Sequence, residues 1–303
     1  MRFVVDQLIL GLTNGAIFAL IALGYTLVYG IIELINFAHG DVFTVGAFIA
    51  LVLIGSFGLE KMSPLMLLLA LILLFLVTMT INGLVGVTIE RVAYRPLRHA
   101  PRLAPLITAV GVSFILEGIL FLIVGPNQVH YPNLLPSAEV TLGDLTVRQN
   151  ALLIIAIAVV LMVVLQQFIQ RTRIGRAMRA TAQDRDAARL MGININRTIS
   201  ITFFIGSALA AAGGIIYGFY FQSISFDLGF RNGLIAFTAA VFGGIGNVIG
   251  ASLGGFVIGL ILGAIGGFFP GGQQWADVVV FSILILVLVF RPTGLLGMRV
   301  PEK

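Results

Sequence analysis

Residues 8–30, LILGLTNGAIFALIALGYTLVYG, form an unbroken apolar run that decides the class of this protein. A helix needs about 20 mostly apolar residues to cross the hydrocarbon core of a bilayer, and this run is long enough. Arg2 before it resembles the start of a secretory signal peptide, but the run is too long for one and no polar, small-residue cleavage site follows. We therefore expect a membrane span that the protein keeps.

The composition of the whole chain agrees with a protein embedded in lipid. Of the 303 residues, 59% are hydrophobic and 10% are charged, whereas soluble domains carry about 25% charged residues. The net charge of +5 comes from a few arginine clusters, which argues against a nucleic-acid partner. There is no cysteine and the three histidines lie in different regions, so we expect no metal site and no cofactor.

Seven apolar runs, the first included, predict spans, and one further region is ambiguous. The expected spans cover residues 6–29, 40–58, 64–89, 103–124, 150–170, 197–221 and 276–290. Residues 232–268 are apolar but contain FGGIGNVIGASLGG, which predicts two short helices that meet inside the membrane or a re-entrant pair. The predicted fold is an all-α integral membrane protein with one transmembrane domain over residues 1–303. It has about eight transmembrane helices, with glycine-rich broken or re-entrant segments in a pseudo-repeated arrangement.

Basic residues predict the orientation, because they concentrate in the short cytoplasmic loops of membrane proteins. Of the 18 lysines and arginines, fourteen fall in three clusters and four lie elsewhere. The clusters are Arg91, Arg95, Arg98 and Arg102; Arg171, Arg173, Arg176, Arg179, Arg185, Arg189 and Arg197; and Arg291, Arg299 and Lys303. We expect all three clusters to be cytoplasmic, the N-terminus to lie outside, and the number of crossings to be odd.

The loop expected outside, residues 125–149, contains three prolines and the stretch EVTLGDLTV. This stretch alternates around a Gly-Asp turn, as a small hairpin does. The loop is thus a folded cap or a polar linker between two spans.

The cytoplasmic segment 171–197 contains AQDRDAARLMG, which predicts a short helix closed by Gly192. Ala187, Ala188 and Met191 form a small and apolar face on it, while Arg185 and Arg189 are paired at helical spacing. Such a helix can dock into a groove on a partner. The alternative is an ordinary solvated loop.

Three motifs together resemble one transporter family. Within DAARLMG, Asp186 occupies the glutamate position of the Glu-Ala-Ala-x3-Gly motif by which permeases of ABC importers engage their ATPases. Residues 14–48, with Asn-Phe-Ala-His-Gly-Asp, and residues 233–260, with the late glycine-rich run, closely resemble permeases of the branched-chain amino acid ABC importers, most of all the LivH type. The resemblance covers almost the whole chain.

The resemblance implies half of a translocation path for branched-chain, hydrophobic amino acids in the inner membrane of a bacterium. The implied partners are a second permease of the LivM type, two cytoplasmic ATPases and a periplasmic binding protein. The chain is not expected to be an enzyme, because Lys61 and Lys303 both follow glutamate and neither fits a P-loop. The alternatives are an importer of urea or short amides and, with less support, an ion-driven secondary transporter.

Glycine and polar residues in the spans are candidates for the translocation path or a gate. Gly40, Gly46 and Ala47 share the spacing of Gly244, Gly250 and Ala251, which suggests paired helix breaks that line the path or pack helices closely. The candidates are Asn36, His39, Gly40, Asp41, Gly46, Glu117, Gly243, Gly244, Gly246 and Gly250.

The polar candidates also have a structural interpretation. Asn36 is expected to cap a helix that begins at Phe37, with Asp41 favouring its N-terminal dipole. Glu117 lies mid-span and is expected to face the pore or to bond Asn82 or Ser113 on another helix.

Overall fold

The computed structural model describes residues 2–98, 100–101, 103–136, 138–142 and 145–297, and these form an almost entirely helical protein. The α-helices are α1 (Arg2–Ile32), α2 (His39–Phe57), α3 (Pro64–Ile89), α4 (Leu103–Val124), α5 (Gln149–Arg171), α6 (Arg173–Gln183), α7 (Arg185–Leu190), α8 (Ile195–Phe221), α9 (Leu228–Gly243), α10 (Val248–Phe268) and α11 (Gly272–Phe290). Short elements are η1 (Leu59–Lys61), the π-helical turn η2 (Glu90–Tyr94), η3 (Arg95–Leu97), β1 (Val129–His130), β2 (Glu139–Leu142), β3 (Leu145–Arg148) and β4 (Ser223–Ile224).

Among the described residues, eight helices are long and apolar enough to cross a membrane, which confirms the predicted fold class. The ambiguous region contains two helices, α9 and α10, separated by residues 244–247. Only α9 is short, at 16 residues. The shorter α9 is also apolar, but it is not among these eight helices.

Local sequence signals set where several helices begin and end. Asn194 and Asn247 precede α8 and α10, and their side chains accept hydrogen bonds from backbone N–H groups of the first turn. Gly58 ends α2 in the left-handed conformation. The chain therefore breaks at residues with a physical reason to break it.

The core is formed by α1 and α8, which the other helices surround. In the most apolar stretch of each helix, 83% of α1 and 78% of α8 are buried inside the protein. The corresponding share is 11% for both α3 and α11. Glycines let α1 and α10 approach backbone to backbone, because a Cβ at Gly15 would lie 2.8 Å from the Cα of Phe256. The outer helices α3, α4 and α11 face lipid or a partner chain.

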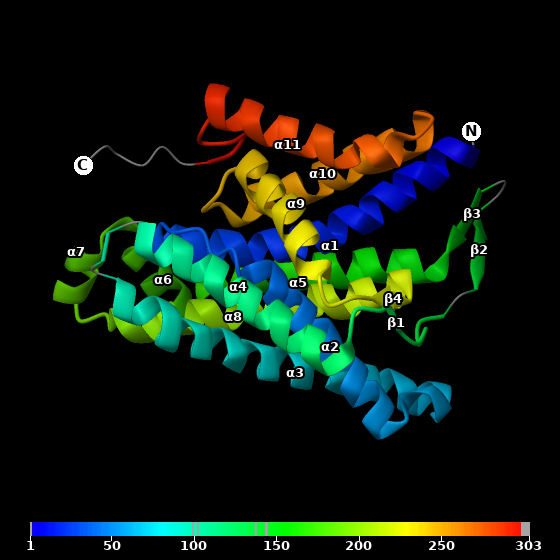
Figure 1. Ribbon diagram of the computed structural model, residues 1–303, viewed down its shortest axis with the longest axis horizontal. Helices are drawn as coiled ribbons and strands as arrows, with labels where there is room; N and C mark the ends of the chain where they lie inside the picture. Colours follow the sequence, from blue (N-terminus) through cyan, green and yellow to red (C-terminus); the bar gives the residue numbers. More distant parts are fainter. Residues whose placement is uncertain (1, 99, 102, 137, 143–144, 298–303) are drawn as a thin grey trace.

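Polar elements lie at the two ends of the helix bundle. Figure 1 shows the N-terminus and all four strands at one end, with α6 and α7 at the opposite end. The described members of the three basic clusters belong to the α7 end, as predicted; Arg102, Arg299 and Lys303 lie outside the described residues. These basic residues therefore lie at the end of the bundle opposite the strands.

The loop between α4 and α5 is a folded cap rather than a linker. Strands β2 and β3 pair antiparallel with Glu139 opposite Arg148 and Leu142 opposite Leu145, which confirms the hairpin, although its predicted Gly143–Asp144 turn lies outside the described residues. Strand β1 pairs with β4 after α8, and Tyr131 is fully buried. The loop is therefore fixed to the end of α8.

The helices α1–α4 and α8–α11 form an inverted repeat. Glu33 and Gln222 are the two described non-glycine residues with positive φ, at 56° and 54°, and each directly follows the end of its helix. The number of residues from Glu33 to Gln222 equals the number from His39, where α2 begins, to Leu228, where α9 begins. Because α1 runs towards the α7 end and α8 runs away from it, the two halves have opposite directions.

This repeat corrects the register predicted from glycine spacing. Gly40 corresponds to Gly229 in the repeat, and the two backbones touch, since a Cβ at either glycine would collide with the carbonyl of the other. Gly244 instead lies in the break after α9 with φ of 111°. The shared spacing of Gly40 and Gly244 is thus not a structural equivalence.

Candidate functional site

The predicted short helix is present as α7, at the end of the bundle opposite the strands. Asp184 caps its N-terminus, because its Oδ1 accepts hydrogen bonds from the N–H groups of Asp186 (2.9 Å) and Ala187 (3.0 Å). Gly192 closes the other end with φ of 82°, and the N–H of Ile193 donates to the Ala188 carbonyl. This hydrogen bond spans six residues and is typical of the Schellman motif, which fixes the chain direction after α7.

Arg185 connects α7 to the core of the protein. Its Nε and NH2 groups both donate to the carbonyl oxygen of Ile31, at 3.2 and 2.6 Å. Ile31 lies in the last turn of α1, whose carbonyls have no partner within the helix. The break at Glu33 follows two residues later and leads into α2. Arg185 therefore links α7 to the junction of α1 and α2.

The exposed face of α7 differs from the predicted one at a single position. Ala187 and Asp186 are exposed, and Met191 is 82% exposed, as a docking face requires. Ala188 is only 3% exposed and belongs to the buried core, so it does not lie on the exposed face as predicted. Leu190 is 88% exposed and was not among the predicted residues, although an apolar residue next to Met191 in a polar segment was an available signal.

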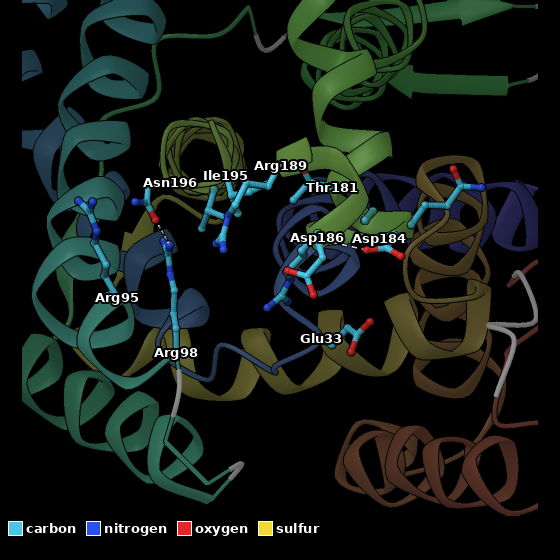
Figure 2. A pocket seen from close by; sticks show the side chains of 13 residues that line it. Glu33, Arg95, Arg98, Thr181, Asp184, Asp186, Arg189, Ile195 and Asn196 are labelled. Carbon is cyan, nitrogen blue, oxygen red and sulfur yellow. Dashed lines mark hydrogen bonds between the residues drawn. The ribbon is translucent and has the colours of Figure 1, made fainter. Parts of the chain in front are cut away.

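A cavity of about 580 Å³ lies beside α7 and is lined mainly by charged residues. In Figure 2, Arg95, Arg98 and Asn196 lie on one side of this cavity, Glu33, Asp184 and Asp186 lie on the other, and Arg189 points into the space between them. Arg185 also lines the cavity. The cavity therefore brings together members of two basic clusters that are far apart in the sequence.

A buried ion pair fixes one wall of the cavity. Glu90 is fully buried in η2, where its carboxylate pairs with Arg98 and accepts a hydrogen bond from Ser200 of α8 at 2.7 Å. Arg98 also donates to Asn196. Burial lowers the pKa of the Arg98 guanidinium, while the neighbouring Glu90 carboxylate opposes this shift. This network ties the end of α3 to the start of α8.

Asn36 does not cap α2 as predicted. The helix begins at His39, its N-cap position is Ala38, and no side chain caps it. The side chain of Asn36 is turned away, and its Oδ1 accepts a hydrogen bond from the Tyr94 hydroxyl at 2.7 Å. Asn36 thereby joins the linker before α2 to η2, close to the Glu90 network.

Asp41 and His39 are buried in the first turn of α2. The carboxylate of Asp41 accepts a hydrogen bond from Ser113 of α4 and interacts electrostatically with Glu117, one helical turn further on. The position of Asp41 in the first turn agrees with the predicted dipole contact. The His39 ring packs edge-on against Tyr25 with centroids 4.8 Å apart. These contacts hold α2 against α1 and α4.

The predicted hydrogen bond from Glu117 to Asn82 or Ser113 is wrong, because both side chains are engaged elsewhere. Ser113 donates to Asp41, and Asn82 donates to the carbonyls of Val42 (3.0 Å) and Ser207 (2.8 Å). Asn82 thus bridges α2, α3 and α8 at a point where Gly46 packs on α8. Glu117 is half-buried on α4.

The glycines between α9 and α10 pack protein against protein. Gly243 and Gly250 touch through their backbones, and Gly246 adopts a φ of 93°. The freed carbonyls of Phe242 and Gly243 accept hydrogen bonds from the N–H groups of Leu295 and Leu296. The segment after α11 therefore fills this break, and the freed backbone groups need no water-filled route.

The described residues contain no cluster of His, Cys, Asp and Glu that could hold a metal ion. The arrangement consists of a short helix with exposed apolar residues, a charged cavity beside it, and hydrogen bonds from Arg185 to the end of α1.

Comparison with known proteins gives one consistent result. Residues 7–288 match the protein family described as branched-chain amino acid transport system / permease component. The high-affinity branched-chain amino acid transport system permease protein BraD of Pseudomonas aeruginosa is 45% identical over 98% of this chain and 97% of its own length. LivH of Escherichia coli (strain K12) is 39% identical over 99% of this chain and 98% of its own. The probable LivH of Methanocaldococcus jannaschii is 30% identical over 92% and 88%.

Proposed function

The chain belongs to the family of branched-chain amino acid transport permeases, and from this membership we propose that it forms one half of a translocation path that ATP hydrolysis drives. It is a multi-pass membrane protein and a permease component, not a catalytic subunit. The proposed partners are a second permease of the LivM type, two cytoplasmic ATPases and a periplasmic binding protein. The proposed location is the bacterial inner membrane, with the N-terminus outside.

The observation that carries this proposal is the construction of α7. Leu190 and Met191 expose large apolar side chains at the cytoplasmic end, outside the lipid, where such exposure indicates a protein partner. Arg185 on the same helix is bonded to the end of α1. In the proposal, the ATPase holds Leu190 and Met191, and its closure on ATP moves α1 and α2 through Arg185.

The candidate path residues have different roles in this proposal. Gly40 and Gly229 touch where α2 crosses α9, so this crossing is a pivot between the two halves of the repeat. Asp41 and His39 hold α2 in place, and Glu117 is the half-buried carboxylate left to face the path. Gly243, Gly244, Gly246 and Gly250 serve helix packing.

Branched-chain amino acids are the proposed substrates, since the similar permeases named for such substrates align with nearly the whole chain. Urea or short amides have no comparable support. A secondary transporter would place coupling carboxylates at the midplane, and Glu117 is the single candidate among the described residues.

Co-purification with a charge placed on α7 tests the proposal. The wild-type chain should recover the ATPase, the second permease and the binding protein after mild detergent extraction. Leu190→Glu should lose the ATPase but keep the second permease, because a buried carboxylate in an apolar interface costs several kcal/mol, about the order of a typical hot spot. Gln170→Glu, an exposed position at the end of α5, adds the same charge away from α7 and should lose nothing. Recovery of the ATPase with Leu190→Glu would contradict the proposed docking surface.

A further inference from the structure

Two neighbouring cavities near α7 share part of their lining. The charged cavity beside α7 has a volume of about 580 Å³, and a second cavity of about 180 Å³ adjoins it. Glu33, Arg98, Arg185 and Ile199 line both of them. A ligand at these four residues therefore lies next to both cavities.

The two cavities differ in chemistry. The larger one has basic groups on one side and carboxylates on the other (Figure 2). Apart from the shared residues, the smaller one is lined by aliphatic and aromatic groups: Ile32, Leu34, Tyr94, Leu97, Ala100, Pro105 and Phe203. Together they match a molecule with a positive group, a negative group and a compact apolar group.

Several charged groups of the larger cavity are available to such a ligand. Within the described part of the chain, the side chains of Glu33, Arg95 and Arg189 make no hydrogen bond or ion pair, whereas Arg98 is held by Glu90 and Arg185 by Ile31. Glu33 is exposed in the cavity at the entrance to the apolar space. A charge-assisted hydrogen bond to such a group is stronger than one between neutral partners.

We propose that the two cavities together bind the transported amino acid on the cytoplasmic side, with its aliphatic side chain in the smaller cavity. This inference rests on the proposed function for the choice of substrate. Glu33 accepts from the ammonium group, Arg95 and Arg189 donate to the carboxylate, and the branched side chain lies among Leu34, Leu97 and Phe203.

Occupancy of this site is coupled to transport through Arg185. The same side chain lines both cavities and holds α7 to the carbonyl of Ile31. A ligand that binds one arrangement of α7 and α1 more tightly than others shifts the population towards it. Amino acid that accumulates inside the cell therefore stabilises this arrangement of α7 and α1 and slows further uptake.

Initial uptake rates at different internal leucine concentrations test the inference. The complete transporter is reconstituted in proteoliposomes with ATP inside, and labelled leucine is supplied with the binding protein outside. Internal leucine should inhibit the wild type. Internal glycine should inhibit on the order of a hundredfold more weakly, because it lacks four buried carbons at about 0.8 kcal/mol each.

Two variants remove different parts of the site. Glu33→Gln loses the partner of the ammonium group, and Ala100→Leu fills the apolar space without changing a charge. Each should raise the half-inhibitory leucine concentration about tenfold or more, relative to its own uninhibited rate. Glu60→Gln, in η1 at the outer end, is the control. Internal leucine should inhibit uptake by this variant as strongly as it inhibits the wild type.

Normal uptake that internal leucine does not inhibit would overturn the cytoplasmic site and leave the proposed function standing. Equal inhibition of the wild type, Glu33→Gln and Ala100→Leu would also overturn it. Absence of leucine uptake by the wild type with its binding protein and ATP would instead contradict the proposed function itself.

Discussion

Two glycines of α2 should respond in opposite directions to the same substitution. A Cβ at Gly40 would collide with the carbonyl oxygen of Gly229 and lie 3.0 Å from the Cα of Gly233, all within α9. Gly55, on the same helix, has no atom within 4 Å of the Cβ position. Gly40→Ala must therefore push α2 away from α9, while Gly55→Ala only stiffens the helix.

The magnitudes follow from these surroundings. Overpacking costs about 1–3 kcal/mol, so Gly40→Ala should lower the free energy of unfolding by about that amount. Gly55→Ala should raise it by about 0.5–1 kcal/mol, because alanine loses less backbone freedom than glycine when the helix forms. Unfolding in mixed SDS–detergent micelles, followed by helical circular dichroism, measures both. Equal effects of the two substitutions, or a stabilising Gly40→Ala, would refute the close crossing of α2 and α9.

Three further predictions concern single side chains. Asp41→Asn keeps an acceptor for Ser113 and should assemble and transport normally, whereas Asp41→Leu should lose about 0.6–1.7 kcal/mol of stability; loss of uptake by an assembled Asp41→Asn transporter would show that the charge itself is needed. Burial raises the pKa of Tyr131, so above its ordinary pKa of about 10 the unfolded chain loses the proton first and stability falls as pH rises. Tyr131→Phe should reduce this alkaline loss in melting curves measured from pH 8 to 11, and an unchanged loss would contradict it. A transporter with Arg185→Gln should keep its ATPases bound and hydrolyse ATP, but with little uptake, because α7 loses both hydrogen bonds to Ile31. A normal ratio of amino acid taken up to ATP hydrolysed in proteoliposomes would exclude a coupling role for these hydrogen bonds.

The helices were predictable because length and apolarity decide whether a segment spans a bilayer. The predicted span 103–124 has the bounds of α4, and the predicted hairpin and the closure of α7 by Gly192 are also confirmed. Each of these features depends on residues close together in the sequence. Periodicity and turn chemistry are sufficient to find them.

The errors concern contacts between distant segments. Asn36 was predicted to cap a helix that begins at Phe37, but its side chain instead accepts a hydrogen bond from Tyr94, far away in the sequence. Ala188 was predicted on the exposed face of α7 but is buried in the core, because nothing in the local sequence shows which side of a six-residue helix packs on the rest of the protein. Likewise, the correspondence of Gly40 with Gly229 can be recognised only when the helix boundaries are known. The glycine spacing alone paired Gly40 with Gly244 instead.

Cysteine cross-linking at α7 tests the central claim most directly, because the chain contains no cysteine of its own. Leu190→Cys and Ala188→Cys lie two residues apart on one helix, with exposures of 88% and 3% in the native side chains. In the assembled transporter, a short bifunctional reagent should join Leu190→Cys to the ATPase and should leave Ala188→Cys unreacted. A cross-link from Ala188→Cys with none from Leu190→Cys would contradict the orientation of α7, and no ATPase cross-link from either position would contradict its role as the docking helix.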